Sequence, residues 1–215
     1  WSDKYHRTFL SRRRLIKDVR TNLMLRWMYE NFPGMPLVLI LRHPCAVASS
    51  QSRADHQFSG LGAHFLGQPE LVDDFLQPHL EAIQSPNSSF EEKILRWCIQ
   101  NAVPLAQFEY GQIHVVFYEE LCVDAHSVLE RLFDYLDLPL NLDQIELSRQ
   151  SPASNKTSAI LTGGSLADQW REYVTLDEIE VAEKILESFG LDVLYTGASM
   201  PNSENLPGLM RSELR

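Results

Sequence analysis

Apolar residues gather in two short runs along the chain and follow a helical spacing between them. Residues 37–41 are all apolar and lie between a proline and the break Arg42-His43-Pro44. Residues 113–117 form a second, mostly apolar run just after Gly111. Such runs are typical of strands covered on both faces, as in parallel sheets. A further short strand is predicted over residues 14–17.

Helical spacing of apolar residues predicts helices over residues 21–31, from Pro44 onward and over residues 70–76. Capping-box patterns mark two more helix starts, at Ser89 with Glu92 and at Thr175 with Glu178. The order strand, helix, strand predicts an α/β fold in which helices flank a parallel sheet.

The length of 215 residues suits one domain with a sizeable core. Residues 56–87 carry scattered Gly, Pro and aromatic residues and are interpreted as a variable lid. From Gly197 onward the sequence is polar and punctuated by Pro and Gly, which predicts a flexible tail over 197–215. The domain is therefore expected to cover residues 1–196.

The most informative segment follows the predicted strand 37–41. Arg42 stands where that strand ends, and Pro44 suits the first turn of a helix. Small residues, Ala46 to Ser50, come next and would let this helix lie close to the sheet. Because open α/β sheets bind ligands at this edge and a helix start offers free N–H groups to anions, an anion site is predicted here.

Arg42-His43-Pro44 with Ser50 resembles the RxPxxxxxS element of the sulfotransferases that use 3′-phosphoadenosine 5′-phosphosulfate (PAPS). Residues 115–121, VVFYEEL, and the apolar helix pattern up to Pro139 resemble a second block of that family. Residues 158–175, SAILTGGSLADQWREYVT, resemble its cofactor-covering loop and the helix start after it. With Ile16-Lys17-Asp18, these blocks follow the family's order over residues 16–195.

The resemblance implies a P-loop nucleotide-kinase-like fold and transfer of a sulfuryl group from PAPS to a hydroxyl or amine of a small-molecule acceptor, with no metal required. Arg42 and Ser50 would hold the 3′-phosphate, and Tyr118 would lie beside the adenine. Lys17 would face the sulfonate. The acceptor itself cannot be identified from the sequence.

The general base implied by the resemblance is a residue near Lys17, where this chain has Asp18. His43, His56 and His64 are alternatives, because an unperturbed histidine suits proton abstraction.

The covering loop departs from the family, because many relatives carry an Arg-Lys-Gly triplet before the tryptophan and this chain does not. Lys156 upstream and the amides of Gly163 and Gly164 are candidate replacements for phosphate binding.

The second departure from the family is that the N-terminal phosphate loop is missing. No GxxxxGK(S/T) or comparable Gly-rich loop occurs in the sequence, and the chain starts with Trp1. We therefore expect the C-terminal portion of a longer sulfotransferase or an inactive remnant. The alternatives are a non-catalytic nucleotide-binding or interaction remnant and a small-molecule kinase of the same fold.

Charge is unevenly distributed along the chain, whose net charge is −10. Residues 1–53 hold ten of the nineteen Lys and Arg against three acidic residues, a balance of +7, which leaves −17 for the remainder. This pattern favours a small anionic ligand and disfavours nucleic acid as a partner.

Compartment and oligomeric state are less well marked in the sequence. No apolar run approaches the length of a membrane span or a signal-peptide core. The odd set Cys45, Cys98 and Cys122 stands in apolar contexts and indicates buried thiols, which suits a cytoplasmic protein. Oligomeric state stays open.

Overall fold

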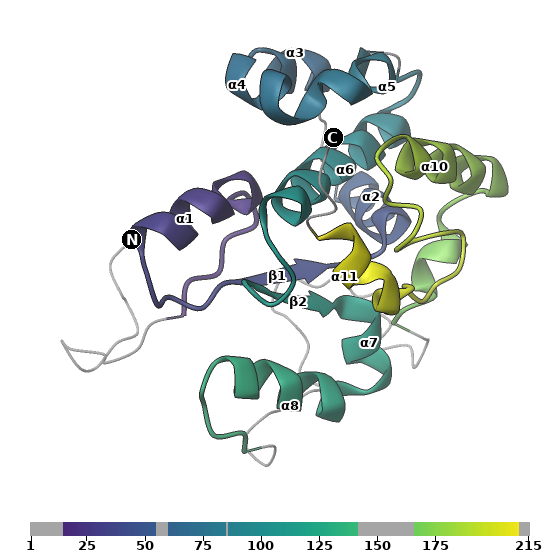
Figure 1. The fold of residues 1–215 in the computed structure, drawn as a ribbon. Helices are drawn as coiled ribbons and strands as arrows, with labels where there is room; N and C mark the ends of the chain where they lie inside the picture. Colours follow the sequence, from purple (N-terminus) through teal and green to yellow (C-terminus); the bar gives the residue numbers. More distant parts are fainter. Residues whose placement is uncertain (1–14, 55–59, 85, 142–165, 211–215) are drawn as a thin grey trace.

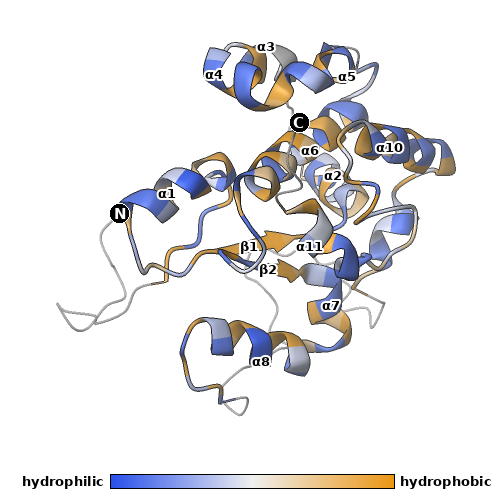
Figure 2. Cartoon of the chain, in the orientation of Figure 1, coloured by the Kyte–Doolittle hydropathy of each residue, from blue (hydrophilic) through white to orange (hydrophobic). Residues whose placement is uncertain are grey.

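The computed structural model describes residues 15–54, 60–84, 86–141 and 166–210. Two parallel strands lie at its centre, β1 (Val38–Leu41) and β2 (His114–Phe117), and Leu41 is paired with Phe117. Within the described residues they form a two-stranded sheet surrounded by helices (Figure 1). Both strands fall in the predicted apolar runs, and Figure 2 shows them as apolar segments at the centre of the fold. The predicted parallel pairing is confirmed.

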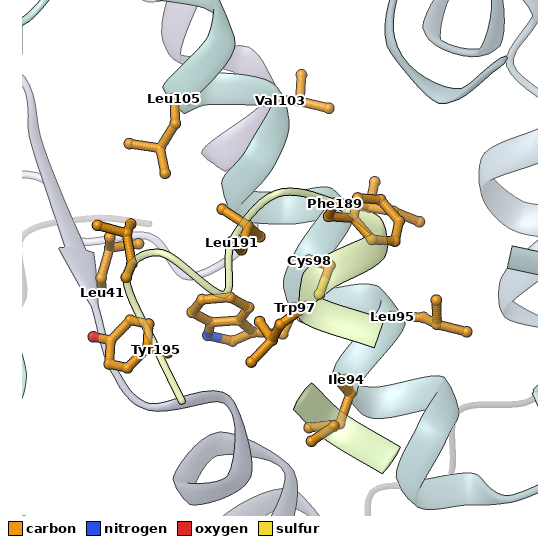
Figure 3. Close-up of a cluster of buried hydrophobic side chains, with 14 of the residues drawn as sticks. Leu41, Ile94, Leu95, Trp97, Cys98, Val103, Leu105, Phe189, Leu191 and Tyr195 are labelled. Atoms are coloured by element: carbon orange, nitrogen blue, oxygen red, sulfur yellow. The ribbon is translucent and has the colours of Figure 1, made fainter. Parts of the chain in front are cut away.

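A helical layer covers one side of the sheet. Helix α2 (Pro44–Arg53) follows β1 after a two-residue turn, and α6 (Ser89–Gln107) packs against both α2 and α10 (Leu176–Ser188). Leu41 of β1, Trp97 of α6 and Tyr195 gather in the buried cluster drawn in Figure 3. The apolar faces predicted from helical spacing thus form the core.

Helix α1 (Leu25–Asn31), with a 3-10 turn at Asn22–Met24 before it, matches the helix predicted over residues 21–31. Helices α7 (Tyr118–Val123) and α8 (Ala125–Tyr135) follow β2, and α8 lies on the side of the sheet opposite α6 (Figure 1). No helix among the described residues combines the length and hydropathy needed to cross a membrane.

The predicted lid contains α3 (Leu61–Leu66), α4 (Pro69–Leu71) and α5 (Leu80–Gln84), which lie together beyond one end of α6 in Figure 1. The helix predicted over residues 70–76 is divided between α4 and a π-helical turn, Val72–Leu76.

The two predicted capping boxes have different outcomes. Thr175 and Glu178 form the predicted box, in which the Thr175 hydroxyl accepts from the Glu178 N–H at 3.2 Å and the Glu178 carboxylate accepts from the Thr175 N–H at 2.9 Å. At α6 the cap is Ser88, whose hydroxyl accepts from the Glu91 N–H at 3.1 Å. Helix α6 does begin at Ser89, but the predicted cap is one residue late, because Ser88 is the residue with extended backbone angles.

A short strand is predicted over residues 14–17, but residues 15–17, the part that the structure describes, do not form one. Residues 15–20 are exposed coil, and the side chains of Leu15 and Ile16 are 95% and 71% exposed. The Asp18 carboxylate accepts from the Arg20 N–H at 2.7 Å. This local turn is favoured by aspartate and replaces the extended conformation, since only two apolar residues favour a strand here.

The described part of the predicted flexible tail, residues 197–210, is also different from expectation. It contains a 3-10 turn, Ser203–Asn205, and helix α11 (Leu206–Leu209). Leu206 and Met210 are buried in the core, with 6% and 4% of their surface exposed. Their spacing of four residues places both on one helical face, and burial of that face anchors a segment whose composition alone suggested mobility.

Candidate anion-binding site at the carboxyl ends of the strands

The first residues beyond each strand face one another across the sheet edge. Arg42 follows β1 and Tyr118 follows β2, and the Arg42 Cζ atom lies 4.5 Å from the centroid of the Tyr118 ring. The Nε atom of Arg42 is buried and has no hydrogen-bond partner within the part of the chain that the structure describes. A buried guanidinium donor without an acceptor is costly. Its chemistry therefore fits an anionic group bound at this edge.

His43 is completely buried and holds the turn from β1 into α2. Its Nδ1 atom accepts from the Cys45 N–H at 3.2 Å, which caps the helix, and Nε2 donates to the Thr196 carbonyl at 2.9 Å. The ring stacks on Trp170 with centroids 4.3 Å apart. Burial lowers the pKa of His43 from 6.5 to about 4. Because both ring nitrogens are engaged, the geometry does not suit His43 as a general base.

Glu119 is a buried carboxylate in direct contact with the turn from β1 into α2. Its Oε1 atom accepts from the His43 N–H at 2.8 Å, and Oε2 accepts from the Tyr195 hydroxyl at 3.1 Å. Burial raises the pKa of Glu119, and the hydrogen bonds from His43 and Tyr195 act in the opposite direction. Sequence reasoning missed both Glu119 and Tyr195. The one available signal was an acidic residue placed two positions after the end of a predicted strand.

The segment Trp170-Arg171-x-Tyr173, which follows the predicted covering loop, packs against the turn at His43. Trp170 is buried in a 3-10 turn, Gln169–Glu172, that packs on α2. Arg171 stacks on Trp170 and donates to the Gly197 carbonyl and the Ser199 hydroxyl. These contacts anchor the start of the segment that had been predicted to be a tail.

The other predicted site residues are placed as follows. Ser50 is half-buried on α2, two turns beyond His43. Lys17 and Asp18 lie in the exposed segment 15–20, which in Figure 1 approaches the sheet from the side where β1 begins. The structure thus brings Arg42 and Tyr118 together and leaves Lys17 and Asp18 outside the sheet.

Some candidate residues cannot be placed in the site. His64 is exposed on α3. Lys156, Gly163, Gly164 and His56 lie outside the described residues.

A cavity of about 610 Å³ lies along β2, α7 and α8. Its walls include Phe117, Glu120, Arg131 and Tyr135, and the C-terminal segment borders it with Leu206 and Met210 among others. Arg42 and Tyr118 are not among its lining residues. The cavity is therefore separate from the candidate anion site, which is defined by the contacts of Arg42 with Tyr118.

Taken together, the fold and the site define a protein that presents a buried guanidinium donor, without a partner among the described residues, at the carboxyl ends of parallel strands and beside a helix start. Residues 2–142, which are 141 of the 215 residues, match the family model described as "Sulfotransferase family". The chain belongs to this family, and the predicted resemblance is confirmed.

Other comparisons add less. No curated protein matches the chain. Among solved structures, it is similar to a sulfotransferase domain from the curacin biosynthetic pathway, with 17% identity and a TM-score of 0.46. That similarity covers 79% of this chain and 60% of that domain, so the chain spans less than two thirds of the solved structure.

Proposed function

We propose that this chain is a PAPS-dependent sulfotransferase, or the C-terminal portion of one, that moves a sulfuryl group to a hydroxyl or amine of a small-molecule acceptor. Family membership supports sulfuryl transfer in general terms. The observation that carries the choice of donor is the buried Nε of Arg42 at the strand end, which has no hydrogen-bond partner among residues 15–54, 60–84, 86–141 and 166–210. A planar guanidinium binds a phosphate bidentately, which an ammonium cannot do.

The proposed roles of the neighbouring residues follow from this placement. Tyr118 covers one face of the Arg42 guanidinium, so the edge that carries the N–H groups is the part left for the 3′-phosphate. The start of α2 adds its N–H dipoles, and Ser50 is proposed to add a hydroxyl from the same helix. The Tyr118 ring is proposed to border the adenine.

Sulfuryl transfer, like phosphoryl transfer, is an in-line displacement in which the protein mainly positions groups and stabilises charge. Lys17 is proposed to neutralise the sulfonate and Asp18 to accept the acceptor's proton. Both roles require the exposed segment 15–20 to move to the carboxyl ends of the strands, because it approaches the sheet from the side where β1 begins (Figure 1). Lys156, Gly163 and Gly164 stay predicted phosphate contacts.

We also propose that β1, α2 and β2 belong to a P-loop nucleotide-kinase-like sheet. The parallel pairing and the helix that directly follows β1 support this assignment.

Calorimetric titration with PAP, the desulfated product of PAPS, tests the proposal. We expect PAP to bind with equal affinity in the presence and absence of Mg²⁺. Preference for ATP with Mg²⁺ would indicate a kinase, and the absence of binding by either nucleotide would indicate a remnant. Both of these results contradict the proposed function.

Substitution of Arg42→Lys sharpens the test, because it keeps the charge and removes the planar fork. We expect at least a tenfold loss of PAP affinity, about 1.4 kcal/mol, with little change in thermal stability. Arg26→Lys is a matched control, since Arg26 also lies over a tyrosine ring, with its Cζ 5.8 Å from the Tyr29 centroid, but belongs to α1. Equal PAP affinities for the two variants would show that Arg42 does not bind the nucleotide.

A further inference from the structure

The register of the two strands continues beyond their last backbone pair through side-chain contacts. Leu41 and Phe117 are the last paired residues. One step further, Arg42 stacks on Tyr118, and one step beyond that the Glu119 carboxylate accepts from the His43 N–H. Glu119 therefore takes the place that a strand carbonyl would occupy in a longer sheet.

From this geometry we infer that Glu119 is a positioning residue, which fixes the backbone on both sides of Arg42 and so aims its guanidinium at the anion. The inference rests on the proposed function for the identity of that anion. Leu41 is held by the sheet ladder and His43 by Glu119, so Arg42 lies between two anchored residues. A shift of about 1 Å in a positioned group is enough to weaken binding or catalysis strongly.

The second oxygen of Glu119 connects this turn to the C-terminal part of the chain. It accepts from the Tyr195 hydroxyl, while the next residue, Thr196, accepts from the His43 ring. Glu119, His43 and Tyr195 are each at most 1% exposed. The residues that hold Arg42 in place thus include a segment that lies beyond the family match at residues 2–142.

Charge supports the same role. Burial raises the pKa of the Glu119 carboxyl, and the nearby Arg42 guanidinium opposes that rise, yet the Arg42 Nε has no hydrogen-bond partner among the described residues. Glu119 therefore offsets part of the arginine's charge without using that donor. This leaves the Nε–H group ready for an external acceptor.

Two readouts test the inference in Glu119→Gln. The first is the solvent-exchange rate of the Arg42 Nε proton, measured by NMR without any ligand. The second is the affinity for PAP, measured at a temperature where circular dichroism shows the variant folded. Glutamine keeps the volume but turns an NH₂ group toward His43 N–H or Tyr195 O–H. We expect proton exchange at least tenfold faster and PAP binding at least tenfold weaker.

Glu183→Gln is the control, because the half-buried Glu183 carboxylate also holds this C-terminal segment, through the Gly197 N–H, without a hydrogen bond to the turn at Arg42. We expect both readouts to stay at wild-type values in this control. Tyr195→Phe keeps the His43 bond and removes only the hydroxyl, so we expect exchange and affinity to change about threefold. This milder variant decides the question if Glu119→Gln does not fold.

Unchanged Arg42 exchange in a folded Glu119→Gln protein, or in Tyr195→Phe when the first variant is unfolded, would overturn the inference. An equal loss of PAP affinity in Glu183→Gln would also overturn it, because the effect would then follow general loosening. Failure of the wild-type protein to bind PAP contradicts the proposed function alone. The exchange rate then still decides whether Glu119 positions Arg42.

Discussion

At the scale of single residues, the chemistry of the site depends on a histidine that stays neutral. His43 accepts one hydrogen bond at Nδ1 and donates one at Nε2, a pattern available to the neutral ring and lost when the ring is doubly protonated. Its stacking on Trp170 and its edge contact with Tyr195 exclude water from the ring. Protonation of His43 therefore opposes the folded structure at the point where Arg42 is held.

The lowered pKa of His43 predicts how stability depends on pH. The unfolded chain binds a proton to this ring below about pH 6.5, whereas the folded protein does so only near pH 4. The unfolded state then holds more protons, so this contribution to the free energy of unfolding is complete above pH 6.5 and falls as the pH drops toward 4. At pH 4.5 the loss is about 2.5 kcal/mol.

Urea unfolding at pH 7 and pH 4.5 measures this loss by comparing the wild type with His43→Gln. The raised pKa of Glu119 adds stability as the pH falls, and the lowered pKa values of His79 and His114 remove it. All three groups are present in both proteins, so the difference between the two pH profiles isolates His43. Parallel profiles would show that His43 does not carry the effect.

At the scale of elements, local signals predicted most of the secondary structure. The runs at 37–41 and 113–117 contain β1 and β2, and the Thr175 and Glu178 pattern marks the start of α10. The capping residue of α6 could not be fixed in the same way, because Ser88 with Glu91 and Ser89 with Glu92 both satisfy the capping pattern. In the structure Ser88 is the cap, because its hydroxyl accepts from the Glu91 N–H, and sequence spacing alone does not distinguish the two serines.

The capping box of α10 predicts a stability change that depends on one hydroxyl. Thr175→Ala removes the acceptor for the Glu178 N–H and leaves that donor to solvent. We expect a loss of about 1 kcal/mol in the free energy of unfolding, measured with urea. Thr175→Ser keeps the hydroxyl and should stay within about 0.5 kcal/mol of the wild type. Equal losses in both variants would indicate that the threonine methyl group, not the cap, is responsible.

At the scale of the whole molecule, the site is completed by contacts that no local pattern shows. Glu119 and Tyr195 are separated by 76 residues, and His43 and Thr196 by 153. Spacing and motif could place Arg42 and Tyr118 at strand ends, since each follows its own apolar run. Spacing and motif could not show which distant residues hold the Arg42 edge of the sheet, because packing across the core determines those contacts.

The same packing explains why residues 197–210 are ordered despite their composition. The Asn202 N–H donates to the Leu194 carbonyl at 2.9 Å, and the Asn205 side chain donates to the Val193 carbonyl at 2.9 Å. These bonds join the segment to the residues directly before Tyr195. Burial of Leu206 and Met210 supplies the apolar part of the same attachment.

Leu206→Ala tests whether this attachment contributes to the stability of the fold. Loss of a buried leucine side chain removes transfer free energy and leaves a cavity, and because Leu206 borders an existing cavity we expect about 2 to 3 kcal/mol, the lower part of the usual range. Leu176→Ala is the matched control, since Leu176 is 76% exposed on α10 and its loss should cost less than about 0.5 kcal/mol. Urea unfolding followed by circular dichroism measures both variants. If Leu206→Ala is as stable as the control, the segment behaves as the flexible tail that its composition predicted, and it adds nothing to the support of Tyr195.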